Sequence, residues 1–224
     1  QSVAELAIGL MFAAARGISS HDRLIREGKW DRAGQGLQLG GRRLGLVGLG
    51  GIGRHVAHIA IACGMKVSAC DPMVTSESVD SVTMIESLPD LVANSDVLSL
   101  HCPLTPQSRH LINAQMIAML PKGAIVINTA RGGLIDEEAL AEALTSGHLA
   151  GAGLDTLENE PPLPGSPLLK LPSVVLTPHV GGSTDAALSA TAAAAARNAL
   201  QVLRGEAVPR NICVNPQILE KENS

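Results

Sequence analysis

The chain has 224 residues, of which 46% are hydrophobic and 17% charged, and its formal net charge is -4. A chain of this composition can bury a sizeable core, which argues against intrinsic disorder. It contains no run of basic residues and no apolar stretch near the ~20 residues of a membrane span, so we expect neither a nucleic acid nor a membrane as its partner.

Aromatic residues and cysteines are few. The sequence holds one Phe, one Trp and no Tyr, so the core must consist of Leu, Ile, Val and Ala, which suits helices packed on a parallel sheet. The four cysteines lack the CxxC spacing of a metal or redox site, and no signal peptide opens the chain. We therefore expect free thiols, a cytoplasmic location and no metal site.

The N-terminal part is predicted to be helical. Ser2 and Glu5 have the spacing of a capping box, and apolar residues then recur at helical intervals. A second, more charged helix is expected to end near Gly28, and residues 31–43, rich in Gly and Arg, indicate an irregular loop.

From there on, apolar strand patterns alternate with helical patterns. The strand patterns are short aliphatic runs, and the helical ones have apolar residues three or four positions apart. This alternation predicts an α/β fold, a Rossmann-like doubly wound parallel sheet with helices on both faces, whose ligands bind at the carboxyl ends of the strands. The predicted strands are 44–48, 66–70, 96–100, 123–127, 151–154 and 173–177, and the predicted helices are 51–63, 87–94, 113–119, 136–146 and 184–204.

The first predicted strand runs into a glycine-rich turn. Gly48, Gly50 and Gly53 form a GxGxxG motif, in which the first glycine permits a tight turn, the second lets the backbone approach a pyrophosphate, and the third lets the next helix lie close to the strand. The free N–H groups at the start of that helix attract phosphate. The motif predicts a dinucleotide site, although such turns also occur without one.

An acidic residue follows the second predicted strand. Asp71 lies about twenty residues beyond the glycine motif, where a carboxylate accepts hydrogen bonds from the adenosine ribose and repels a 2′-phosphate. No arginine occurs at 72–74. We therefore predict NAD rather than NADP as the cofactor. The alternative is a solvated aspartate at a tight turn.

The third predicted strand is followed by His101, Cys102 and Pro103. The proline indicates a rigid loop that could flank the adenine and ribose, and Cys102 is interpreted as a backbone contact rather than a nucleophile. His101 is interpreted as a strand-end histidine that hydrogen-bonds locally. His55 and His58 lie three apart on a predicted helix, but without a third ligand they do not predict a metal site.

The fourth predicted strand ends shortly before Arg131, Gly132 and Gly133. An arginine at a strand end can bind a carboxylate through two parallel hydrogen bonds, and the glycines open the backbone beside it. The alternative is a salt bridge to a neighbouring helix, and the residues alone do not decide between the two.

His179 stands between a proline and two glycines, after the sixth predicted strand. Such a histidine is a candidate general acid when a carboxylate stabilises its protonated form. Glu158 and Glu160, which follow the fifth predicted strand, are both candidates for that carboxylate. Asp136 to Glu138 are interpreted as the capped start of a helix.

In combination, these motifs resemble the nucleotide-binding domain of the D-isomer-specific 2-hydroxyacid dehydrogenases. The similarity extends over nearly the whole chain, and the forms of the His179 motif and of Asp71-Pro72 look most like the D-3-phosphoglycerate dehydrogenase branch. The segments that carry the resemblance are Gly45–Gly53, His101–Thr105, Asn128–Leu140, Gly153–Pro161 and Thr177–Thr184.

The resemblance implies roles for individual residues. Arg131 would bind the substrate carboxylate and carbonyl, His179 would be the acid/base, and Glu160 would pair with His179. Asp155 would hold the nicotinamide end of the cofactor. The cofactor-binding residues implied by motif and resemblance together are Gly48, Gly50, Gly51, Ile52, Gly53, Asp71, Cys102, Pro103, Thr129, Ala130, Arg131, Asp155, His179, Gly181 and Gly182.

The resemblance also implies a domain organisation. Residues 1–205 would form the NAD-binding domain, within which the helices of residues 1–30 would serve as the arm of a homodimer. Residues 206–224 would return to a substrate domain that we expect to be missing. Without that domain, the chain alone is expected to catalyse poorly.

The function expected from the resemblance is that of an oxidoreductase acting on CH–OH donors. It would transfer hydride between NAD and a 2-hydroxy or 2-oxo acid, with 3-phosphoglycerate as one candidate. The alternative is an NAD-sensing binding protein of the corepressor type, which shares the fold and the Arg–Glu–His set. The identity of the acid stays open, because the substrate domain would contribute most of the specificity.

Overall fold

The computed structural model describes residues 1–32, 34–74, 81–206, 209 and 213–215. The chain divides into two compact units, Gln1–Gly181 and Gly182–Ser224, and the second contains α7 (Asp185–Leu203). The boundary expected from the sequence lies after residue 205, with α7 in the cofactor domain. Most of the expected returning segment, 206–224, lies outside the described residues.

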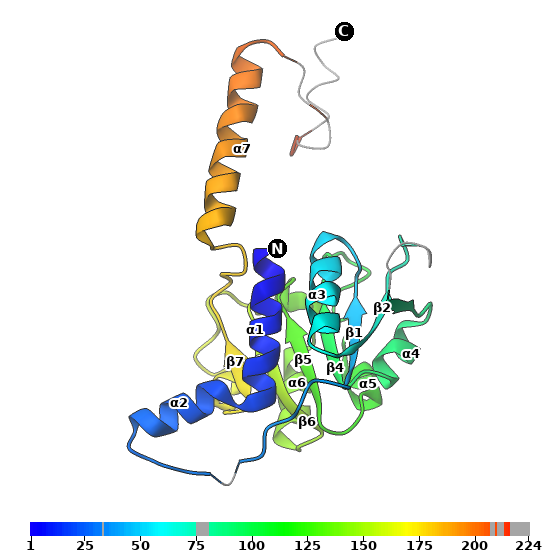
Figure 1. Ribbon diagram of the computed structural model, residues 1–224, viewed down its shortest axis with the longest axis vertical. Helices are drawn as coiled ribbons and strands as arrows, with labels where there is room; N and C mark the ends of the chain where they lie inside the picture. Colours follow the sequence, from blue (N-terminus) through cyan, green and yellow to red (C-terminus); the bar gives the residue numbers. More distant parts are fainter. Residues whose placement is uncertain (33, 75–80, 207–208, 210–212, 216–224) are drawn as a thin grey trace. The chain divides into compact units, whose positions relative to one another are not determined.

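The first unit is built on a seven-stranded parallel sheet (Figure 1). The strand order is β3-β2-β1-β4-β5-β6-β7, which reverses direction between β1 and β4 and makes that point the topological switch of a doubly wound sheet. The predicted fold class is confirmed. The strands are β1 (Arg43–Val47), β2 (Lys66–Cys70), β3 (Val82–Met84), β4 (Val97–Leu100), β5 (Ala124–Asn128), β6 (Leu149–Leu154) and β7 (Val174–Leu176).

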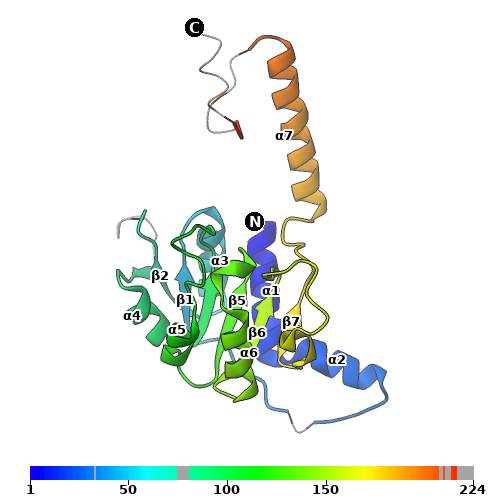
Figure 2. The same ribbon diagram turned by 180° about the vertical axis from the view of Figure 1, so that it is seen from behind.

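Helices cover both faces of this sheet (Figures 1 and 2). Two buried apolar clusters lie between sheet and helices, one including residues of α1 and α3 and the other residues of α4, α5 and α6. The strands β4 and β5 are buried along their whole length, which explains their continuous apolar runs. The helices are α1 (Ser2–Arg16), α3 (Gly51–Ala62), α4 (Leu88–Ala93), α5 (Ala114–Met119) and α6 (Glu137–Thr145).

The start of α1 differs from the predicted capping box. The helix begins at Ser2 itself, so its N-cap is Gln1, and the carbonyl of Gln1 accepts the first helical hydrogen bond from the Glu5 N–H at 3.0 Å. A short second helix, α2 (Ile18–Arg26), follows. In the described part of the chain no single helix is long and apolar enough to cross a membrane; α1 and α2 reach that length and hydropathy only as a pair, bent by 63°.

Candidate functional site

The turn after β1 contains glycine at two positions where a side chain would not fit. Gly48 has a φ of 96°, and a Cβ on it would lie 2.8 Å from the carbonyl carbon of His101. A Cβ on Gly53 would lie 2.4 Å from the carbonyl oxygen of Gly48, so α3 packs directly on the turn. At Gly50 and Gly51, by contrast, a Cβ would meet nothing within 4 Å. The N-cap of α3 is Gly50, and within the described ranges no side chain caps the helix, so a phosphate group can approach its first N–H groups.

Asp71 follows β2 and contacts the same turn. Its Oδ2 accepts a hydrogen bond from the Leu49 N–H at 2.7 Å, and its Oδ1 accepts one from the Met73 N–H at 2.8 Å. These bonds orient the carboxylate, and each of its oxygens can still accept a further hydrogen bond. Asp71 is therefore fixed beside the glycine turn with acceptor capacity left for ribose hydroxyls.

The loop after β4 lies against the glycine turn. Nε2 of His101 is 2.9 Å from Oγ of the buried Ser99, which confirms the predicted local hydrogen bond. Burial lowers the pKa of His101 to about 4, so its ring is neutral at pH 7. Burial also raises the pKa of the Cys102 thiol, which disfavours a thiolate nucleophile. Pro103 begins the exposed part of this loop.

Acid is expected to destabilise the fold through His101. Below pH 6.5 the unfolded chain binds a proton on this ring, whereas the folded chain does not until about pH 4, so stability falls as the pH drops through this window. The loss from His101 amounts to about 3 kcal/mol. Urea unfolding between pH 7 and pH 4 should show a shallower pH dependence in His101→Gln and an unchanged one in His58→Gln, an exposed histidine. Equal pH dependence in wild type and His101→Gln would contradict this assignment.

Asn128, the last residue of β5, shapes the backbone that carries Arg131. Its buried side chain accepts a hydrogen bond from the Ala130 N–H at 3.0 Å and donates one to the Arg131 carbonyl at 2.9 Å. Asn128 is not among the site residues expected from the sequence, although a polar residue at the end of an apolar strand is a usable signal. The neighbouring Thr129 is buried, and among the described residues its Oγ1 has no hydrogen-bond partner, so this hydroxyl can serve a bound group.

The side chain of Arg131 is exposed. Its Nη1 donates to the Ala130 carbonyl at 2.6 Å, and within the described ranges it forms no ion pair with a helix. The structure thus gives no support to the alternative of a salt bridge. The other N–H groups of the guanidinium are left for an external carboxylate.

Gly132 joins the Arg131 loop to the segment that follows β6. A Cβ on Gly132 would stand 1.9 Å from the carbonyl carbon of Leu157 and 2.3 Å from the nitrogen of Glu158. Those are backbone atoms that no rotamer change can move away, so glycine is required at this position. Two loops from neighbouring strands are thereby packed against each other.

Asp155 organises the loop that carries His179. Its carboxylate is 2% exposed and accepts three hydrogen bonds, from Thr177 Oγ1 at 2.6 Å, the Val180 N–H at 2.9 Å and the Gly181 N–H at 2.8 Å. The carbonyl of Asp155 also accepts the His179 N–H at 2.8 Å. The contact of Asp155 with a nicotinamide stays a prediction. Thr177 belongs to the Thr177–Thr184 motif that carries the resemblance, but it was not selected as a site residue.

His179 is paired with Glu160. Nδ1 of His179 lies 2.7 Å from Oε2 of Glu160, and Oε1 of Glu160 accepts the Leu157 N–H at 3.1 Å. Burial alone would raise the pKa of Glu160, but the hydrogen bonds from His179 and Leu157 bring the pKa of this carboxyl below its ordinary value. Glu160 is therefore ionised at neutral pH and can balance a positive charge on His179.

Glu158, the other candidate partner, is engaged elsewhere. Its carboxylate is hydrogen-bonded to Nε2 of His110 and lies 3.7 Å from Nη2 of Arg109. Its backbone N–H donates to Oε1 of Glu137 at 2.6 Å. The carboxylate beside His179 is thus that of Glu160.

The expected site residues from Gly48 to Gly181 follow β1, β2, β4, β5, β6 and β7 and so lie at one edge of the sheet. Contacts run continuously from Gly132 through Leu157 and Glu160 to His179. Gly182 differs from the others because it opens the second unit. Within the described residues, no cluster of His, Cys, Asp and Glu suits a metal ion.

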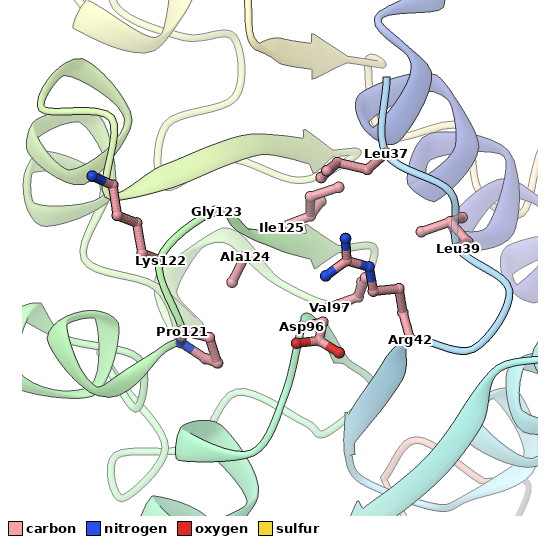
Figure 3. Close-up of a pocket in the computed structure, with 10 residues that line it drawn as sticks. All are labelled: Leu37, Leu39, Arg42, Asp96, Val97, Pro121, Lys122, Gly123, Ala124 and Ile125. Atoms are coloured by element: carbon pink, nitrogen blue, oxygen red, sulfur yellow. The ribbon is translucent and has the colours of Figure 1, made fainter. Parts of the chain in front are cut away.

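Among the described residues, the amino-terminal edge of the sheet is lined by a small cavity only. A cavity of about 20 Å³ there has room for about one water molecule. Asp96, which lines it, is ion-paired with Arg43 at 2.8 Å, and Lys122 extends away from Arg42 (Figure 3). The cavity is too small for a cofactor, and its cationic side chains do not converge on one point.

Comparisons with known proteins agree with the arrangement at the carboxyl edge. The profile described as "D-isomer specific 2-hydroxyacid dehydrogenase, NAD binding domain" matches residues 8–181. The chain is 43% identical over 224 residues to a D-3-phosphoglycerate dehydrogenase of Methanocaldococcus jannaschii, with 99% of the chain and 42% of the relative covered. It is 49% identical over 186 residues to a hydroxypyruvate reductase of Thermotoga maritima, with 82% and 60% covered.

A solved structure shows the same fold. The crystal structure of a glyoxylate reductase from Paecilomyes thermophila matches with a TM-score of 0.86 at 37% identity, over 92% of this chain and 63% of that one. The chain therefore spans between 42% and 60% of the length of the two curated relatives named above.

Proposed function

The chain belongs to the D-isomer specific 2-hydroxyacid dehydrogenase family, whose NAD-binding domain it matches, and we propose that it supplies the cofactor site and the acid/base pair of an NAD-dependent oxidoreductase. The proposed reaction is hydride transfer between the nicotinamide and a 2-hydroxy or 2-oxo acid. The observation that carries this proposal is the 2.7 Å hydrogen bond between His179 and Glu160, at the same sheet edge as the glycine turn.

The residues at that edge fit NAD. Open backbone at Gly50 and Gly51 leaves room for a pyrophosphate, and Asp71 has acceptors for ribose hydroxyls. The hydroxyl of Thr129 has no hydrogen-bond partner among the described residues. When bound, NAD supplies or accepts the hydride. The remaining residues proposed to contact it are Gly48, Ile52, Gly53, Cys102, Pro103, Ala130, Arg131, Asp155, His179, Gly181 and Gly182.

Three side chains carry the proposed chemistry. Arg131 binds the substrate carboxylate through two parallel hydrogen bonds and so orients the 2-oxo group. His179 donates a proton from Nε2 to the carbonyl oxygen, because its Nδ1 is occupied by Glu160. Glu160 stabilises the positive charge of the ring before transfer. In the oxidative direction, Nε2 of His179 takes the proton of the hydroxyl group.

We infer 3-phosphoglycerate as the first substrate to test. In its support, the Methanocaldococcus relative, which is aligned with 99% of the chain, is a D-3-phosphoglycerate dehydrogenase. Hydroxypyruvate and glyoxylate are the other candidates, from the names of the Thermotoga relative and of the solved reductase. Reaction rates with the three acids, compared side by side, would rank them.

A second copy of the chain is the proposed partner. The α2 region exposes 52% of Ile18 and 55% of Ile25, and Trp30 beyond it is 79% exposed. Apolar surface of this kind is stabilised when a partner covers it. We infer a homodimer through residues 1–30, which sedimentation of the 23.1 kDa chain would reveal as a doubled mass.

The four cysteines are free, which supports a cytoplasmic location.

Asp71→Ala is expected to weaken NAD binding about 10- to 100-fold, because it removes charge-assisted hydrogen bonds to the ribose. Calorimetric titration of the chain with NAD and with NADP measures this loss and also the preference for NAD. Asp90→Ala, which removes an exposed carboxylate of α4, is the control and should bind NAD normally. An unchanged affinity in Asp71→Ala would contradict the role of Asp71, and no binding of either nucleotide would contradict the cofactor site itself.

A further inference from the structure

Glu137 is a partly buried carboxylate whose hydrogen-bond partner is remote in the sequence. It is the first residue of α6, and its Oε1 accepts the Glu158 N–H at 2.6 Å. The helix already has a cap, since Oδ1 of Asp136 accepts the Ala139 N–H at 3.1 Å. Burial raises the pKa of Glu137, the Glu158 N–H lowers it and the charge of Glu158 raises it, with a net rise. The start of α6 therefore does not by itself explain this burial.

The peptide that Glu137 binds is held from other sides as well. Gly132 packs against the Leu157–Glu158 peptide so closely that no Cβ fits between them. The carboxylate of Glu158 is hydrogen-bonded to the ring of His110. The backbone N–H of His110 donates to the Gly133 carbonyl at 2.8 Å. The segment after β6 is thus anchored to the Arg131 loop by backbone packing and by His110, and to the start of α6 by Glu137.

This anchored segment touches the acid/base pair directly. The Leu157 N–H donates to Oε1 of Glu160 at 3.1 Å, and Oε2 of the same carboxylate lies 2.7 Å from Nδ1 of His179. The Leu157 N–H belongs to the peptide just before the one that Glu137 and Gly132 contact. A displacement of the backbone at Leu157 and Glu158 would therefore turn the Glu160 carboxylate away from His179.

We propose that Glu137 is a positioning residue, which accepts the Glu158 N–H and thereby fixes the segment that directs Glu160 at His179. Because Glu137 lies in the same stretch of chain as Arg131, it also ties the proposed substrate-binding arginine to the acid/base pair. This inference rests on the proposed function, since it gives Glu137 a task within that site.

Glu138 provides a matched control. It occupies the next position of α6, where a negative charge interacts equally well with the helix dipole, and its side chain is exposed. Among the described residues it has no hydrogen bond to the segment after β6. If Glu137 served only the start of α6, substitutions at the two positions would have the same effects.

The test follows the ring signals of His179 by NMR in the ¹⁵N-labelled chain, identified by their loss in His179→Asn. We expect Glu137→Ala to shift the Nδ1 signal and Glu138→Ala to leave it in place. Glu137→Gln should restore most of the wild-type position, because the amide oxygen can still accept the Glu158 N–H. Thermal unfolding is recorded for each variant, and only variants that are folded are compared.

A folded Glu137→Ala with an unmoved Nδ1 signal would overturn the proposal, and so would an equal shift in Glu138→Ala. If Glu137→Ala does not fold, Glu137→Asp, which withdraws the acceptor by one methylene, replaces it and is interpreted in the same way. Failure of the proposed function would be a separate result, read from the titration of the wild-type chain with NAD.

Discussion

Gly132→Ala is expected to lower the free energy of unfolding by about 3 kcal/mol or more, which is near the upper end of single substitutions. The added methyl group would stand 1.9 Å from the carbonyl carbon of Leu157, so the loop after β5 or the segment after β6 must move. Urea unfolding monitored by circular dichroism measures the loss. In any fraction that still folds, Glu160 should lose its anchor on the Leu157 N–H.

Gly165→Ala is the matched control for this substitution. Gly165 also lies in a loop, but a Cβ there would meet nothing within 4 Å. Its substitution should change the stability by no more than about 0.5 kcal/mol. Equal unfolding midpoints for the two variants would show that the chain near Gly132 yields more easily than its packing indicates.

His179→Asn is expected to reduce kcat/KM for the 2-oxo acid by about 10²–10⁴-fold, the usual contribution of a positioned acid/base. Asparagine is the suitable replacement, because His179 has a φ of 55° and asparagine tolerates that left-handed conformation. The measurement is NADH oxidation by a protein that combines this chain with a substrate domain. The affinity for NAD, measured separately, should fall far less than kcat/KM, because His179 is one of many residues proposed to contact the cofactor.

Glu160→Gln tests the partner of that histidine. Glutamine can still accept a hydrogen bond from Nδ1 of His179, but it does not balance the charge of a protonated ring. The variant should therefore be slower than wild type and faster than His179→Asn. Full activity in His179→Asn would show that His179 is not the acid/base. The proposal that the chain binds NAD would still stand.

Most of the fold could be predicted from the sequence, because its signals are local. The buried strands are continuous aliphatic runs, and Gly48 and Gly53 predict the turn after β1. The strand β3 was missed, since Val82–Met84 has three residues and none of them is fully buried. Its place at the sheet edge comes from pairing with β2, a contact between segments that no local pattern encodes.

The candidate site was predictable as a set of strand ends but not as a set of contacts. From the residues alone, Glu158 and Glu160 were equivalent candidates for pairing with His179. The choice depends on a backbone donor, the Leu157 N–H, and on His110, which draws Glu158 to a different loop. Such interactions join residues of different loops and exist only after the sheet has assembled.

The backbone of His179 has a consequence for the history of this protein. A φ of 55° costs a residue with a side chain roughly 1–2 kcal/mol, whereas glycine adopts it freely. A related protein that no longer needs this imidazole would become more stable through a single change to glycine. Stability alone therefore favours glycine over histidine at this position. The proposed acid/base role offsets this cost, so we expect a related chain with glycine at position 179 to keep the fold and to lack that activity.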